Sequence, residues 1–183
     1  FFAKYSDTKS VYDFTLEKSA VKQNKFALFC LADVQCANQT QYNRFKFEST
    51  PDLKDHASRK GMPCYGVTLG DVVYSQGTRN CDDIMPIMRN LMSKSVMGFP
   101  IFQTMGNHDY TYFNGDNGET VEPDATSSTY NLKLQRAFED VFGPINHSWD
   151  RADAHIVCMR NMQWNNNKAW NHYSDPRFTN EQV

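Results

Sequence analysis

The sequence predicts an α/β (α+β) fold in which buried strands alternate with amphipathic helices. Two observations carry this prediction: four short apolar runs that are typical of strands, and stretches between them with apolar residues at helical spacing. The 183 residues are enough for about one domain with a real core, and the hydrophobic content of 40% is that of an ordinary globular chain. Alternation of this kind indicates helices packed in layers against a sheet.

Strands are predicted where apolar residues run without interruption. The four runs cover residues 26–32, 64–69, 99–105 and 154–159. Unbroken apolar runs favour strands that are buried on both faces, as in a parallel sheet covered by helices on each side. Residues 10–19 alternate between apolar and polar side chains instead, which predicts a half-buried strand.

Helices are predicted between these strands. Thr50 and Pro51 favour a helix start, because Thr is a good N-cap and Pro fits the first turn. Residues 82–95 place one group of apolar side chains on one helical face: Ile84, Ile87, Met88, Leu91 and Met92. Residues 130–142 place a second group together, Leu134, Phe138, Val141 and Phe142, before Gly143 and Pro144 end the helix.

Charge and composition exclude several kinds of partner. The net charge of −2 provides no basic footprint for nucleic acid. The longest apolar runs are under ten residues, which is too short for a membrane span. The five cysteines include no C-x-x-C pair, so neither a disulfide framework nor a zinc–thiolate site is expected.

Side chains suited to metal binding follow three of the apolar runs. Asp33 and Gln35 follow the first run, Asp71 follows the second, and Asn107 with His108 follows the third. The gap from Asp33 to Asp71 is 38 residues and the gap from Asp71 to Asn107 is 36 residues, each about one strand–helix unit. Because ligands bind at the carboxyl edge of open parallel sheets, these side chains are expected to converge there.

The chemistry of these residues predicts a divalent cation site. Carboxylate and amide oxygens are hard donors suited to Mg²⁺, Mn²⁺, Fe or Zn²⁺. Two ions about 3.5–4 Å apart can clamp a phosphate and activate a water, and Asp71, from the middle motif, is the natural bridge between them. His108 is placed to protonate a leaving oxygen or to stabilise transition-state charge. Asp109 is expected to begin the following turn rather than to act in catalysis.

Three motifs resemble a known superfamily. Asp33-x-Gln35, Gly70-Asp71 and the run from Gly106 to Asp109 are similar, in order and spacing, to the first three motifs of the calcineurin-like metallophosphoesterases. The resemblance is narrower to a bacterial multidomain subgroup with an Asp-x-Gln first motif. It implies a β-sandwich flanked by helices, truncated here, with residues 25–183 as the N-terminal part of the catalytic domain. Residues 1–24 would then be a linker from a preceding domain.

The resemblance also implies roles for the site residues. Asp33 and Gln35 would bind the first of two divalent ions, Asp71 would bridge both, Asn107 would bind the second, and His108 would be the catalytic acid. Gln35 stands where most members have His, and Tyr74 where many have a second Asp that orients the catalytic His. The later histidine ligands of the superfamily are not found in this chain, so the site is expected to be incomplete in it.

The function expected from these features is hydrolysis of a phosphomonoester, in a phosphorylated small molecule or a phosphoprotein. Two alternatives stay open: a phosphodiesterase of the same fold, and a degenerate domain that binds a partner without catalysis. Gln35, Tyr74 and the missing histidines favour the second alternative, whereas the joint presence of Asp33, Asp71, Asn107 and His108 argues against it. The resemblance further implies a periplasmic or secreted location, and the sequence leaves substrate, metal identity and oligomeric state open.

Overall fold

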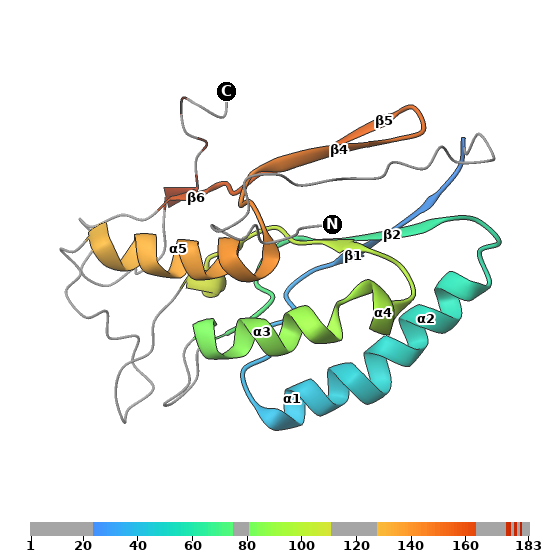
Figure 1. Cartoon of the computed structure of the whole chain (residues 1–183), viewed down its shortest axis with the longest axis horizontal. Helices are drawn as coiled ribbons and strands as arrows, with labels where there is room; N and C mark the ends of the chain where they lie inside the picture. The colour runs from blue at the N-terminus through green and yellow to red at the C-terminus, as the bar shows by residue number, and fades with distance from the viewer. Residues whose placement is uncertain are drawn as a thin grey trace, which may run out of the picture.

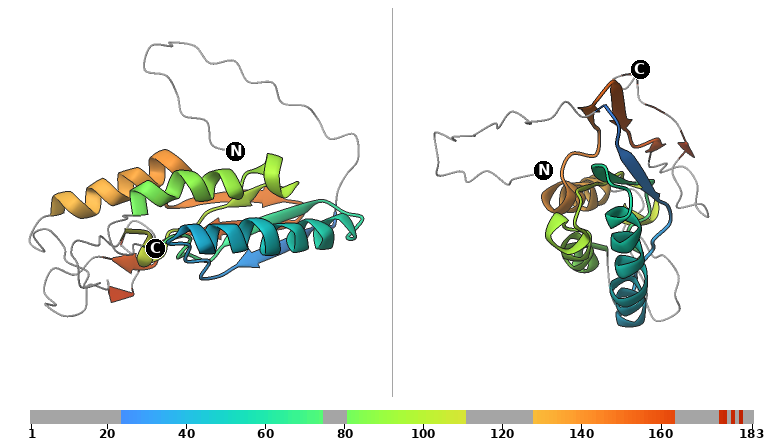
Figure 2. Two further views of the ribbon diagram at one scale, coloured as in Figure 1. Left: turned by 90° about the horizontal axis from the view of Figure 1, so that it is seen from below. Right: turned by 90° about the vertical axis from the view of Figure 1, so that its right-hand side faces the viewer.

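A computed structural model describes residues 24–74, 81–110, 128–163, 175–176, 178 and 180. In this part of the chain, a three-stranded parallel sheet lies between a layer of helices and a β-hairpin (Figure 1). Figure 2 shows the same layers from two other sides. The mixed α/β class predicted from the sequence is therefore confirmed, with a parallel sheet and two small antiparallel ones among the described residues.

The sheet has the order β1-β2-β3, with β1 at Ala27–Leu31, β2 at Cys64–Thr68 and β3 at Ile101–Phe102. Both pairings are parallel, and Leu31 lies opposite Thr68 while Val67 lies opposite Phe102. The carboxyl ends of the three strands therefore meet at one edge. β3 is much shorter than the apolar run at residues 99–105 that predicted it.

The first helical segment is continuous from Gln39 to Ser58. It comprises α1 (Gln39–Arg44), a π-helical turn η1 (Phe45–Ser49) and α2 (Thr50–Ser58), which share helical backbone angles across both junctions (Figure 1). α2 begins at Thr50 with Pro51 in its first turn, as predicted, but the predicted N-cap role of Thr50 is wrong, because Thr50 is buried and continues the helical backbone of the π-helical turn before it. The start is set by Asn38, whose Oδ1 accepts a hydrogen bond from the backbone N of Gln41 at 3.1 Å.

The remaining described helices are α3 (Cys81–Leu91), α4 (Lys94–Met97), the short 3₁₀ helix η2 (His108–Tyr110) and α5 (Ser128–Phe142). The predicted apolar face of α3 is buried except at Ile87, which is 40% exposed; Met85 is buried instead. Gly98, with φ of 84°, ends α4 in the left-handed conformation that Gly adopts without strain. Among the described helices, none is long and apolar enough to cross a membrane.

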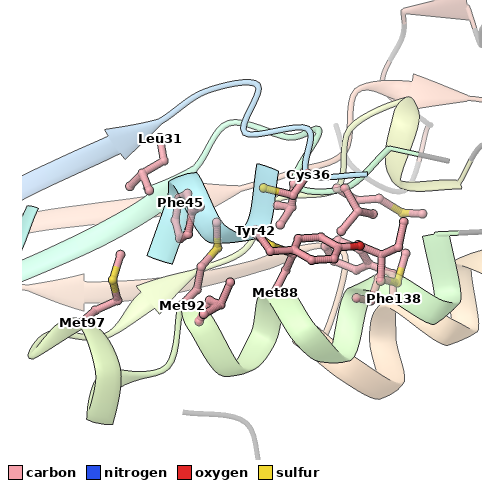
Figure 3. Close-up of a cluster of buried hydrophobic side chains, with 14 of the residues drawn as sticks. Leu31, Cys36, Tyr42, Phe45, Met88, Met92, Met97 and Phe138 are labelled. Carbon is pink, nitrogen blue, oxygen red and sulfur yellow. The ribbon is translucent and has the colours of Figure 1, made fainter. Parts of the chain in front are cut away.

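The core fills the space between the sheet and the helices (Figure 3). It joins residues from β1, from the first helical segment, from α3 and from α5; the labelled members are Leu31, Cys36, Tyr42, Phe45, Met88, Met92, Met97 and Phe138. Phe138, one of the predicted apolar residues of α5, is fully buried. Methionine is common here because its flexible side chain fills irregular gaps between helices.

A hairpin of β4 (His147–Arg151) and β5 (Ala154–Cys158) covers part of the other face of the sheet. The ring of Trp149 stacks on Phe102 with centroids 4.4 Å apart and lies 5.4 Å from the ring of Tyr65. Leu28 and Cys30 on β1 are exposed, so the prediction that the first strand is buried on both faces is wrong. The hairpin contacts β2 and β3 through Trp149, but it leaves Leu28 on β1 exposed.

Two further short strands, β6 (Met162–Gln163) and β7 (Asp175–Pro176), pair antiparallel. The strand predicted at residues 10–19, and the linker predicted at residues 1–24, lie almost wholly outside the described residues. Asn24, just before β1, is the first described residue.

Candidate functional site

The loops that leave β1 and β2 continue side by side past the ends of the strands. The backbone N of Leu69 donates to the O of Leu31, and the backbone N of Gln35 donates to the O of Asp71, both at 2.9 Å. A parallel bridge between Cys36 and Val73 extends the pairing further. This pairing fixes the loop that carries Gln35 against the loop that carries Asp71.

Three of the predicted metal ligands have an unusual backbone conformation. The φ angles are 48° at Asp33, 43° at Gln35 and 53° at Asp71, and only Ala152 joins them among the described non-glycine residues with positive φ. A non-glycine residue in this region carries strain of order 1–3 kcal/mol, and such strain is concentrated at functional sites. The fold therefore holds these three side chains in an orientation that an ordinary strand end would not give.

The side chains of these residues meet around Asp71. The Gln35 Nε2 lies 3.5 Å from Asp33 Oδ1 and 3.4 Å from Asp71 Oδ2, so one amide group spans two carboxylates. These contacts are at the long end of hydrogen-bonding distances. The other carboxylate oxygen of Asp71 accepts a 2.8 Å hydrogen bond from the backbone N of His108. Asp71 is buried and Asp33 is exposed, so the cluster reaches from the interior to the surface.

Asn107 joins Asp33 and Asp71 in the wall of one open cavity of about 540 Å³. The polar residues lie at the carboxyl edge of the sheet, and the hairpin supplies apolar residues such as Ile156 and Val157 on the other side. The cavity has the size of a small-molecule site. All three strand ends thus contribute a predicted ligand to the same concave surface or its rim.

Two glycines allow the second and third loops to approach this closely. A Cβ on Gly106 would lie 2.2 Å from Asp71 Oδ1 and 2.3 Å from the backbone N of Asp71. A Cβ on Gly70 would lie 2.9 Å from the Cα of Gly106, and Gly70 also has a φ of 98°. Real Cβ contacts are not this short, so only glycine fits at Gly106.

Asp109 has a role that the sequence prediction missed. Its side chain is fully buried, and its two oxygens accept hydrogen bonds from Val73 N at 3.0 Å and from Gly106 N at 2.8 Å. Asp109 therefore ties the third loop to the second, just as Asp71 ties the second loop to the third through His108 N. Nothing in the local pattern distinguishes this carboxylate from one at the start of a turn.

Burial raises the pKa of Asp109 to about 7, against the lowering effect of the hydrogen bonds from Gly106 N and Val73 N; the nearby negative charge of Asp71 adds to the increase. Because the pKa of Asp109 is raised in the folded state, the folded protein keeps its carboxyl proton over a pH range in which the unfolded chain has lost it. The stabilisation that results is fully present below the unfolded pKa near 3.8 and is lost as the pH rises to about 7.

The metal-free protein is therefore expected to lose roughly 2–3 kcal/mol of unfolding free energy from this group between about pH 5 and pH 8. Urea denaturation of the native chain and of Asp109→Asn at both pH values measures this difference. The variant has no titrating group at this position, so its stability should change less with pH. Equal pH dependence in both proteins would show that Asp109 keeps an ordinary pKa.

The ring of His108 packs edge-on against the ring of Tyr74, with centroids 4.7 Å apart. Tyr74 occupies the position at which the resemblance expects a carboxylate that orients His108. An aromatic contact of this kind fixes the plane of the imidazole. The departure noted in the sequence thus has a direct structural consequence for this histidine.

The donors gathered here fit a hard divalent cation. Within the described ranges, no three His, Cys, Asp or Glu side chains form a group able to hold a metal. The set consists instead of two carboxylates, from Asp33 and Asp71, and two amides, from Gln35 and Asn107, and oxygen donors of this kind suit Mg²⁺ or Mn²⁺. The amide group of Gln35, which now points its nitrogen at both carboxylates, would turn its oxygen toward a cation.

No family model matches this chain, and neither does any curated protein or solved structure that was compared with it. The structure brings Asp33, Gln35 and Asp71 into contact and places Asn107 in the same cavity wall. His108 adjoins them through its backbone, while its ring contacts Tyr74.

Proposed function

We propose that this chain is part of a divalent-metal-dependent phosphoester hydrolase, of phosphomonoesterase or protein phosphatase type. The observation that supports this best is the convergence of Asp33, Gln35 and Asp71, all with left-handed backbone, at the carboxyl edge of a parallel sheet. The proposal includes the β-sandwich of the calcineurin-like superfamily, to which the described sheet and hairpin would belong.

Asp33, Gln35, Asp71 and Asn107 would hold two divalent cations, Mn, Fe, Zn or Mg. The cations would neutralise phosphate charge and lower the pKa of a water molecule. Asp71 is suited to a central position because its buried carboxylate is already oriented by His108 N through Oδ1, which leaves Oδ2 directed toward Gln35. The open cavity beside these residues would admit the phosphorylated group.

His108 would donate a proton to the leaving oxygen of the substrate. Its backbone is held by Asp71 and its ring plane by Tyr74, so the imidazole is positioned from two sides. General acid catalysis contributes typically 10²–10⁴-fold to a rate, and with the ring of Tyr74 at the position where the resemblance expects an orienting carboxylate we expect about 10²-fold from His108.

The proposal is tested first by Mn²⁺ binding, measured by electron paramagnetic resonance, which requires no turnover. Residues 1–183 and a longer form that extends past Val183 should both bind Mn²⁺, the longer form more tightly. Asp71→Asn should weaken binding by at least about tenfold in each, because it removes a charged donor. Asp153→Asn, at an exposed turn of the hairpin, is the matched control and should leave binding unchanged.

Hydrolysis of p-nitrophenyl phosphate by the longer form, with Mn²⁺, tests the reaction itself. His108→Ala should reduce kcat by about 10²-fold while leaving Mn²⁺ affinity within a factor of about two, since His108 acts on the leaving group. Turnover of bis-p-nitrophenyl phosphate but not of the monoester would favour the phosphodiesterase alternative. If neither form binds Mn²⁺ at millimolar concentration, the proposal fails and a metal-free binding domain takes its place.

A further inference from the structure

A second cavity, of about 790 Å³, lies away from the carboxyl edge of the sheet. It is formed where the end of α3 and the start of α4 face β3, the end of α5 and the start of β4. Its apolar wall includes Met92, Ile101, Phe102, Val141 and Phe142. Both this size and this apolar lining are typical of sites that enclose a small organic molecule.

The charged residues that line this cavity, Arg89 and Lys94, are both cationic. Arg89 and Lys94 line it and are exposed, and neither forms an ion pair with any residue in the described ranges. No Asp or Glu is among the described residues that line the cavity. A surface arginine and lysine on an acidic chain, beside an apolar wall and without a carboxylate partner, are complementary to an anionic group on an apolar ligand.

Gln103 provides an independent indication of a ligand. It lines the same cavity, is only 7% exposed, and its Oε1 has no hydrogen-bond partner within the described part of the structure. Its Nε2 makes only a weak 3.5 Å contact with the sulfur of Met92. A buried amide oxygen without a partner destabilises the protein, so a donor that enters beside it would relieve this cost.

We propose that this cavity binds a small organic acid with an apolar or aromatic body, a carboxylate or sulfonate that reaches Arg89 and Lys94, and an N–H or O–H group that donates to Gln103. The apolar body would lie against Phe102 and Phe142. A water molecule alone would satisfy Gln103 but would account for neither the apolar wall nor the two cations. The proposal is independent of the hydrolase function, because the cavity shares no lining residue with the one at Asp33 and Asp71.

Anilinonaphthalene sulfonate carries all three features, and its binding to the native chain can be measured by isothermal titration calorimetry. We expect one site per chain with a micromolar Kd. Arg89→Ala with Lys94→Ala should weaken binding by at least about tenfold, since each charge-assisted bond is worth more than a neutral one. The control, Lys46→Ala with Lys60→Ala, removes two exposed lysines outside the cavity and should leave Kd unchanged.

Two related probes separate the contribution of Gln103 from that of Arg89 and Lys94. Gln103→Leu should weaken the anilino probe by about fivefold but not naphthalene-2-sulfonate, which lacks the N–H donor. Conversely, the neutral phenylnaphthylamine should be insensitive to loss of Arg89 and Lys94. The proposal is overturned if the anilino probe does not bind at millimolar concentration, if several molecules bind per chain with equal affinity, or if the control pair weakens binding as much as the test pair. If Gln103→Leu binds the anilino probe as tightly as the native chain does, the proposed N–H or O–H contact with Gln103 is wrong.

Discussion

Replacement of Asp109 by alanine is expected to lower the free energy of unfolding by roughly 3–5 kcal/mol and to weaken metal binding as well. The variant leaves the backbone N–H groups of Val73 and Gly106 without the acceptor that each has in the native protein. Each buried unsatisfied N–H costs about 1–3 kcal/mol, and the lost side chain adds a small cavity. The loop that carries Asn107 and His108 would no longer be tied to the loop that carries Asp71.

Urea denaturation and Mn²⁺ titration of Asp109→Ala, Asp109→Asn and the exposed control Asp153→Ala measure this effect. Asp109→Asn keeps one acceptor oxygen but presents an NH₂ group to the second N–H, so it should lie between the native protein and the alanine variant. Asp153→Ala should remain within about 0.5 kcal/mol of the native protein. An Asp109→Ala variant that unfolds like this control would mean that the two backbone contacts contribute little.

Gly106→Ala is expected to have an effect of similar size for a steric reason. The added methyl group would lie 2.2 Å from Asp71 Oδ1 and 2.3 Å from the backbone N of the same residue, so the two loops must separate. Separation breaks the hydrogen bond from His108 N to Asp71 and removes the close contact with Gly70. Overpacking of this kind costs typically 1–3 kcal/mol and occasionally more, and here rigid backbone on both sides places it at the upper end.

Gly61→Ala is the comparison for this variant. Gly61 has a φ of 60° with nothing within 4 Å of the added methyl group, so the substitution carries only the conformational cost of about 1 kcal/mol. Thermal unfolding of both variants, followed by Mn²⁺ titration, separates steric from conformational effects. Gly61→Ala should bind Mn²⁺ like the native chain, whereas Gly106→Ala should not. Equal loss of stability in the two variants, with intact metal binding, would contradict the packing seen around Asp71.

The sequence predicted well whatever depends on a residue and its immediate neighbours. Apolar runs ending in Asp33 and Asp71 located β1 and β2, and the parallel arrangement of strands brought their ends together as expected. The apolar spacing around Phe138 also located α5 and one of its buried side chains. The metal-binding and catalytic roles of the site residues are predictions, which the Mn²⁺-binding and hydrolysis experiments test.

Other features depend on contacts distant in sequence, which no local pattern reveals. The buried position of Asp109 follows from the backbone of Val73, 36 residues away. Thr50 is a good N-cap residue that does not cap a helix here. Asn38 caps the helical segment earlier, and the segment runs through a π-helical turn before it reaches Thr50. Leu28 is exposed because the hairpin covers only part of the sheet, a property of the hairpin and not of β1.

Two reciprocal hydrogen bonds between the loops, from His108 N to Asp71 and from Val73 N to Asp109, also bear on how the protein folds. Val73 N and His108 N each have their acceptor 36 or 37 residues away, so these two N–H groups are satisfied only when both strands are in register. Contacts of such long sequence separation form late, after the loop-closure entropy has been overcome. The site should therefore appear only in the final step of folding, and mutations there should mainly speed unfolding while the refolding rate stays nearly the same.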